Sequence, residues 1–122
     1  MGKIMVVEDE KDVADTMRML IEAHGHKVAV FLDPKKGLEA AKDFDLILLD
    51  IMMPKMTGRQ FLDAMKKKGI KTKVIVVSAV GLPEEIGREI GVKYPGTGFV
   101  SKIDIGDGLV PEIKKFLKED IT

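Results

Sequence analysis

The chain has 122 residues, the size of one domain. Its 20 basic and 20 acidic side chains balance, so a broad basic surface for nucleic acid is not expected, and the lack of cysteine excludes disulfides, thiolate metal sites and cysteine nucleophiles. No apolar run approaches the length of a membrane span, and we expect no signal peptide because the first three residues lead straight into a strand-like run. We therefore expect residues 1–122 to form one cytoplasmic, monomeric domain without membrane contact.

Short apolar runs predict five strands, and amphipathic segments between them predict five helices. The expected strands are 4–7, 28–31, 46–49, 74–77 and 98–100, and the expected helices are 12–23, 34–42, 58–68, 83–91 and 108–119. Asp33 and Pro34 suit the start of the second helix, whereas Gly87 and Gly91 weaken the fourth. Pro111 is compatible with the fifth helix only in its first turn. The alternation predicts an α/β fold with a doubly wound, five-stranded parallel sheet.

Polar residues follow the expected strands at their carboxyl ends, where doubly wound sheets bind ligands. Glu8 and Asp9 follow the first strand, Asp50 the third, Ser78 the fourth and Lys102 the fifth. Each residue alone has an ordinary interpretation: Asp9 as a helix N-cap, Ser78 as a partner of the backbone, and Lys102 as a surface lysine. Together, three carboxylates repel one another unless a cation is present.

Magnesium fits such a cluster, because it binds carboxylates, water and phosphate oxygens. A lysine and a hydroxyl beside the metal suit a phosphoryl group, whose oxygens need charge neutralisation and a hydrogen-bond donor. Asp50 is the best candidate nucleophile, because it ends the central strand and aspartate can form an aspartyl phosphate. His24 and His26 are expected to be exposed residues beside a turn, without a role.

The spacing of these residues resembles the receiver domain of two-component response regulators over essentially the whole chain. Pro54 and Gly58 follow Asp50 by four and eight residues, and the small Ala79 follows Ser78. Leu109 lies seven residues after the lysine. The resemblance implies the flavodoxin-like (βα)5 fold with strand order 2-1-3-4-5.

The resemblance also implies residue roles. Asp50 would be the phosphoacceptor, and the metal ligands of Mg²⁺ would be Glu8, Asp9, Asp50 and the Met52 carbonyl. Ser78 and Lys102 would contact the phosphoryl group, and the switch pair would be Ser78 and Phe99. The donor would be a phosphohistidine on a histidine kinase or phosphotransfer protein. We expect a stand-alone receiver that acts on an unidentified downstream protein and not on nucleic acid.

Two features depart from the family pattern or modify it. Ile103 stands where the family usually has a proline with a cis bond, and because a cis non-proline bond costs about 2.5–4 kcal/mol we expect a trans bond. The reach of Lys102 is then an open question. The resemblance implies that Met52 and Val80, two residues after Asp50 and Ser78 respectively, flank the path of the hydrolytic water, and their apolar side chains predict slow self-dephosphorylation.

Two other functions remain open. A degenerate receiver could serve only as an interaction module, and the missing proline permits this. A magnesium-dependent phosphatase with an aspartate nucleophile is less favoured, because such enzymes commonly carry the nucleophile after the first strand. A flavin-binding domain is disfavoured because the acids after the first strand repel phosphate.

Overall fold

The computed structural model describes residues 2–78 and 84–117. In chain order the elements are β1 (Lys3–Val7), α1 (Lys11–Glu22), β2 (Lys27–Phe31), α2 (Pro34–Ala40), the 3-10 turn η1 (Ala41–Asp43), β3 (Leu46–Asp50), α3 (Gly58–Lys67), β4 (Lys73–Ser78), α4 (Glu84–Lys93), β5 (Gly98–Ser101), the 3-10 turn η2 (Lys102–Asp104) and α5 (Ile105–Leu117). The predicted alternation of strands and helices is confirmed.

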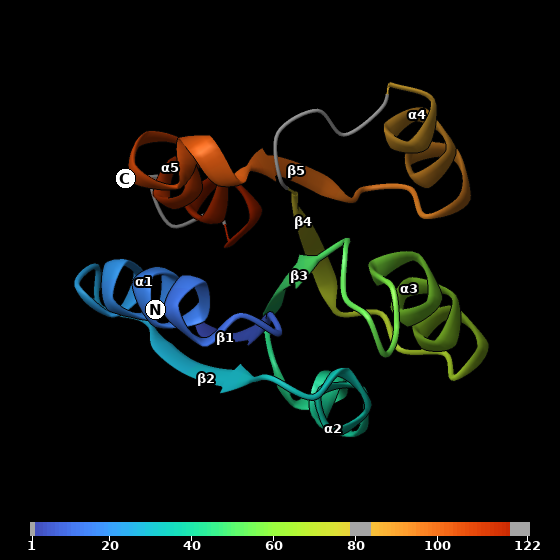
Figure 1. Cartoon of the computed structure of the whole chain (residues 1–122), viewed down its shortest axis with the longest axis horizontal. Helices are drawn as coiled ribbons and strands as arrows, with labels where there is room; N and C mark the ends of the chain where they lie inside the picture. Colours follow the sequence, from blue (N-terminus) through green and yellow to red (C-terminus); the bar gives the residue numbers. More distant parts are fainter. Residues whose placement is uncertain (1, 79–83, 118–122) are drawn as a thin grey trace.

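The five strands form one parallel sheet with the order β2-β1-β3-β4-β5, which confirms the predicted doubly wound fold. Helices α1 and α5 cover one face of the sheet, and α2, α3 and α4 cover the other (Figure 1). Because both faces are covered, β3 is buried along its whole length.

The core consists of two clusters, one on each face. Alternate residues of each strand point to opposite faces, so Met5 and Val7 join one cluster while Ile4 and Val6 join the other. The first cluster receives its helical contribution chiefly from α3, and the second from α1 and α5. Fixing β1 and β3 from both sides gives the residues after these strands a rigid base.

Helix α5 begins earlier than its sequence pattern predicted. The turn η2 leads directly into α5 at Ile105, which packs against the core together with Leu109. Pro111 consequently lies beyond the first turn, and the prediction that placed it in that turn is wrong. The missing N–H of Pro111 leaves the Asp107 carbonyl without its usual helical partner.

His26 is a second correction. It is buried, and its Nδ1 atom accepts a hydrogen bond of 3.0 Å from the main-chain N–H of Gly2. The expectation of an exposed ring is therefore wrong for His26, although His24 is exposed. The bond joins the residues immediately before β1 and β2, which pair as neighbouring strands.

Within the described part of the chain, no helix is both long and apolar enough to cross a membrane.

Candidate functional site

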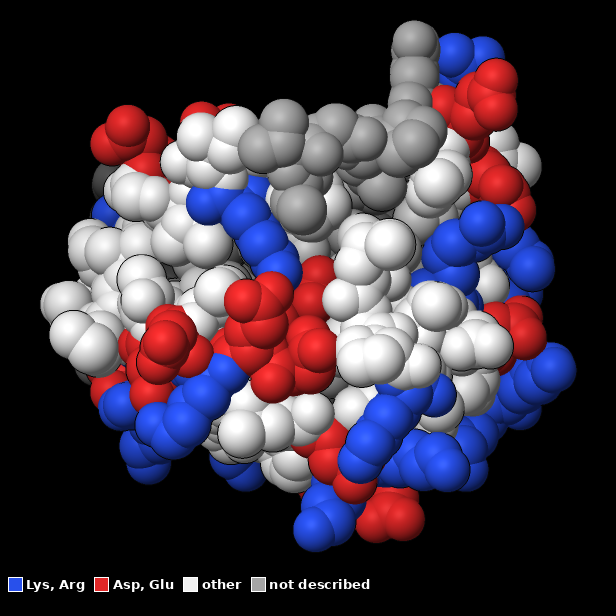
Figure 2. All heavy atoms as spheres, in the orientation of Figure 1, with Lys and Arg blue, Asp and Glu red and all other residues white. Residues whose placement is uncertain are grey.

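The strand register brings the predicted site residues to one edge of the sheet. Asp50 at the end of β3 pairs with Val77 of β4, the residue just before Ser78. Ser78 pairs in turn with Ser101, the residue just before Lys102. Acidic side chains gather over the ends of β1 and β3 near the centre of this face, with basic side chains against them (Figure 2).

The three predicted acids form one cluster. A carboxylate oxygen from each of Glu8, Asp9 and Asp50 lies within 4.8 Å of the other two. Glu8 and Asp50 are almost fully buried, with exposed fractions of 0% and 2%, whereas Asp9 is accessible to solvent. Asp9 is not the N-cap of α1, because Glu10 occupies that position. Asp9 therefore lies in the acidic cluster and does not cap the helix.

Lys102 reaches this cluster even though isoleucine follows it. Its Nζ atom lies 2.8 Å from Glu8 Oε1 and 3.4 Å from Asp50 Oδ1, and its side chain is 18% exposed. The Lys102–Ile103 bond is trans, as expected. The structure thus places the Lys102 ammonium in contact with two of the three acids.

Burial determines the protonation of Glu8. Loss of water raises the pKa of Glu8 from 4.5 to about 7, while the contacts with Lys102 and with the main-chain N–H of Glu10 oppose the shift only in part. Burial alone would lower the pKa of Lys102, but pairing with Glu8 and the charge of Asp50 outweigh burial and raise it. The lysine is therefore a permanent cation at neutral pH.

One carboxylate oxygen of Asp50 is held and the other is not. Oδ1 accepts a hydrogen bond of 3.2 Å from the main-chain N–H of Met52 and faces Lys102. Oδ2 is buried without a hydrogen-bond partner among the described residues. A buried carboxylate oxygen without a partner is unfavourable, and its free lone pairs suit a cation or an incoming phosphoryl group. The acid set and this oxygen fit a magnesium ion.

The remaining predicted residues lie on β4, on β5 and just after β3. Ser78 is buried at the end of β4, Phe99 in β5 is partly exposed, and the Met52 side chain is 73% exposed. Ala79 and Val80 lie outside the described residues.

Gly58 is required by its surroundings. A Cβ atom there would lie 2.8 Å from both the Asp50 carbonyl oxygen and Ile51 Cα. The first residue of α3 thus packs directly against the backbone that carries the phosphoacceptor candidate.

Sequence reasoning gave no role to Ser101. Its hydroxyl accepts a hydrogen bond of 3.3 Å from the main-chain N–H of Ile103 and caps η2. A serine two residues before the bonded amide is an ordinary capping signal, but recognising it required knowing that a turn starts at Lys102.

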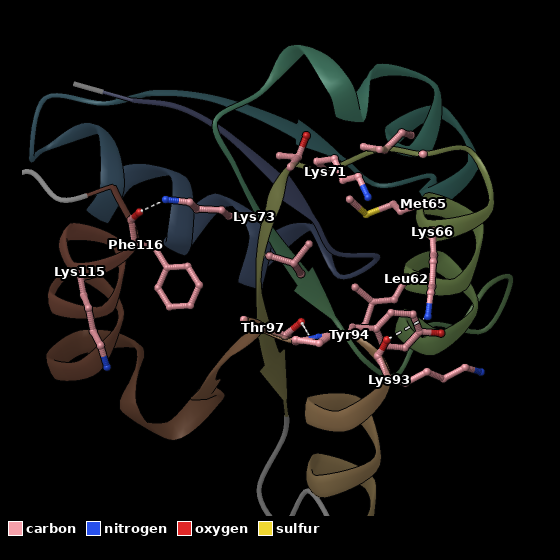
Figure 3. A pocket seen from close by; sticks show the side chains of 16 residues that line it. Leu62, Met65, Lys66, Lys71, Lys73, Lys93, Tyr94, Thr97, Lys115 and Phe116 are labelled. Carbon is pink, nitrogen blue, oxygen red and sulfur yellow. Dashed lines mark hydrogen bonds between the residues drawn. The ribbon is translucent and has the colours of Figure 1, made fainter.

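A groove lies between the carboxyl-terminal ends of α3, α4 and α5, at the amino ends of β4 and β5 and so at the edge opposite the acids (Figure 3). Its volume is about 570 Å³. Lys66 donates to the Lys93 carbonyl at the end of α4, and Lys73 donates to the Phe116 carbonyl near the end of α5. These lysines satisfy helix ends, so we assign the groove no chemistry.

The fold, with acids and a lysine at the switch-point edge of the sheet, defines an α/β signalling domain of the receiver class. The sequence profile of the response regulator receiver domain matches residues 4–105. The chain belongs to this family.

Comparisons with individual proteins agree. The transcriptional regulatory protein CpxR of Escherichia coli K12 is 32% identical over 119 residues, which cover 97% of this chain and 50% of CpxR. The transcriptional regulatory protein YkoG of Bacillus subtilis is 30% identical over 125 residues, which cover 99% of this chain and 53% of YkoG. The chain thus spans about half the length of these curated relatives.

Solved structures show the same fold. The receiver domain of the Francisella response regulator 1452 superposes with a TM-score of 0.84 at 29% identity, covering 98% of each chain. The N-terminal domain of a response regulator receiver protein from Methanoculleus marisnigri superposes with a TM-score of 0.75 at 28% identity, covering 94% of this chain and 95% of that one. The family places the chain in phosphorylation-dependent signalling, in which receiver domains interact with histidine kinases or phosphotransfer proteins.

Proposed function

We propose that Asp50 is the phosphoacceptor of this receiver, that magnesium assists the transfer, and that a partner protein recognises the phosphorylated surface. One observation carries the proposal: Asp50 Oδ2 is buried without a partner among the described residues, in a carboxylate whose other oxygen is held by the Met52 N–H. Lys102 lies 3.4 Å from the other oxygen, Asp50 Oδ1, and a cation at this place suits phosphoryl transfer because it neutralises charge on the phosphoryl oxygens.

The proposed step is a displacement at phosphorus. A carboxylate oxygen of Asp50 forms a bond to phosphorus while the phosphorus–nitrogen bond of a partner's phosphohistidine breaks, and the imidazole nitrogen keeps the electron pair. The hydrogen bond from the Met52 N–H fixes the orientation of the Asp50 carboxylate. Lys102, a cation 3.4 Å from Asp50 Oδ1, would pair with a phosphoryl oxygen.

Glu8, Asp9 and Asp50 would hold the magnesium ion, with the Met52 carbonyl as a further ligand. When bound, the ion neutralises charge on the phosphoryl oxygens. In this structure, the positive charge of Lys102 offsets part of the negative charge of this cluster through its contact with Glu8. We infer that its ammonium turns from Glu8 toward the phosphoryl group when the group is present.

Ser78 and Phe99 would pass the change to the surface. The buried Ser78 hydroxyl would donate to a phosphoryl oxygen, and the partly exposed Phe99 would repack on the strand beside it. We propose that a protein reads this change, because the balanced formal charge does not favour nucleic acid as the partner of this domain.

Intact-mass spectrometry after incubation with acetyl phosphate and Mg²⁺ tests the proposal. We expect the mass to rise by one phosphoryl group, and we expect no rise in Asp50→Asn or in the presence of EDTA. Lys102→Ala should damage phosphorylation or partner binding more than Lys68→Ala, an exposed control. Folded protein that never gains mass would favour an interaction module, whereas turnover of small phosphate esters would favour a phosphatase.

A further inference from the structure

We propose that Ser101 is a positioning residue that holds Lys102 against Glu8 and Asp50. Its hydroxyl supplies the local order that the family pattern would obtain from a proline after the lysine. The role of Ser101 in positioning Lys102 does not depend on the proposed function, whereas its consequence for phosphorylation rests on the proposed function of Asp50.

The polypeptide around Lys102 has few other anchors. Pairing with Ser78 of β4 fixes the chain up to Ser101, where the sheet ends. None of the three residues of η2 is buried, and the Ile103 side chain is 68% exposed. Among the described residues after Ser101, Ile105 is the first that packs against the hydrophobic core.

The Ser101 hydroxyl bridges this interval. Ser101 has extended backbone angles, φ −76° and ψ 142°, and its Oγ atom accepts from the Ile103 N–H at 3.3 Å. The bond connects the residues before and after Lys102, so it restricts the backbone of Lys102 and the direction in which its side chain points. A proline at position 103 would restrict the same segment through its ring but would lack this N–H donor.

Restricting the backbone matters because a lysine side chain is long and flexible. Lys102 must place its ammonium 2.8 Å from Glu8 Oε1, and each added backbone freedom lowers the population of that arrangement. Serine caps are typically worth a factor of about two to thirty in the population of the capped turn. Losing the cap should lower the population of the Lys102 contact by a factor in this range.

Lysine acetylation of the metal-free, unphosphorylated protein tests the geometry directly. With N-hydroxysuccinimidyl acetate at fixed pH, peptide mass spectrometry measures the labelling rate at each lysine. We expect Ser101→Ala to raise labelling of Lys102 about three- to tenfold, with the exposed Lys68 unchanged as internal reference. Ser101→Thr, which keeps the hydroxyl, should restore the wild-type rate. Equal labelling of Lys102 in wild type and Ser101→Ala overturns the proposal.

A double-mutant cycle tests the consequence. Ser101→Ala should slow phosphorylation by acetyl phosphate about three- to tenfold, with the circular dichroism spectrum of the folded protein retained, and should cause no further slowing in a Lys102→Ala background. Equal slowing in both backgrounds would show that Ser101 does not act through Lys102. If the wild type is never phosphorylated, the proposed function fails, while the labelling result still decides the positioning role.

Discussion

Replacing Glu8 by glutamine should stabilise the metal-free protein at neutral and higher pH. Glu8 is fully buried, and burial raises its pKa from 4.5 to about 7. Because the folded state binds this proton more tightly than the unfolded chain, the stability that Glu8 contributes is complete below pH 4.5 and is lost as pH rises through 7. The difference in pKa corresponds to a loss of about 3 kcal/mol by pH 8.

Glutamine keeps the shape of the protonated acid but cannot ionise. It loses the charge pairing with Lys102, so we expect a net gain of about 1–3 kcal/mol at pH 8 and almost no gain at pH 4. A gain of this size raises the melting temperature of a domain of this length by roughly 5–10 °C.

Urea unfolding in EDTA at pH 4 and pH 8 measures this effect. Comparing the free energy of unfolding of Glu8→Gln with that of the wild type at each pH isolates Glu8 from other titrating groups. The control is Glu10→Gln, which removes an exposed carboxyl group two residues away. A Glu8→Gln variant less stable than the wild type at pH 8 would refute the reasoning.

Three further predictions follow from the site. Asp9→Asn should weaken Mg²⁺ binding about tenfold or more in isothermal titration, while the protein stays folded. The exposed control Asp12→Asn should leave the Mg²⁺ affinity unchanged. Equal Mg²⁺ affinities of Asp9→Asn and the wild type would show that Asp9 is not part of the site. Gly58→Ala should cost about 1–3 kcal/mol in urea unfolding, because its Cβ would meet main chain at 2.8 Å, whereas Gly91→Ala, with open space around it in α4, should be neutral or stabilising. Met52→Asn should shorten the half-life of the phosphorylated state, followed by intact mass, because the exposed apolar side chain is replaced by one that can orient water; an unchanged half-life would contradict this.

Much of the fold follows from local sequence patterns. The strands β3 and β4 are continuous apolar runs, and they are buried almost completely in the structure. Asp33 was predicted to cap α2, and its side chain does accept from the Lys35 N–H at 3.0 Å. These features depend on neighbours in the chain, so the sequence is sufficient to find them.

The predictions that failed depend on contacts between distant residues. His26 is buried and accepts a hydrogen bond from Gly2, 24 residues away, and no local pattern reveals that contact. The start of α5 depends on the packing of Ile105 against the core. The reach of Lys102 was an open question and not a failed prediction, because it depends on a turn whose start could not be located from the sequence.

The candidate site was predictable as a set of residues but not as a geometry. Parallel strands place their carboxyl ends at one edge, so Glu8, Asp9 and Asp50 could be grouped from the sequence. The burial of Glu8, its contact with Lys102 and the free Oδ2 of Asp50 required the structure. Those three features give the site a buried acid with a raised pKa, a cation beside it and a carboxylate oxygen that is open to a ligand.

Mapping the phosphorylated residue tests the central claim most directly. The protein is treated with acetyl phosphate and Mg²⁺, then with borohydride, which reduces an aspartyl phosphate to homoserine, and the peptides are sequenced by mass spectrometry. We predict homoserine at position 50 and nowhere else, and none when Mg²⁺ is withheld. Homoserine at another aspartate with none at position 50 would contradict the assignment of Asp50 as the phosphoacceptor.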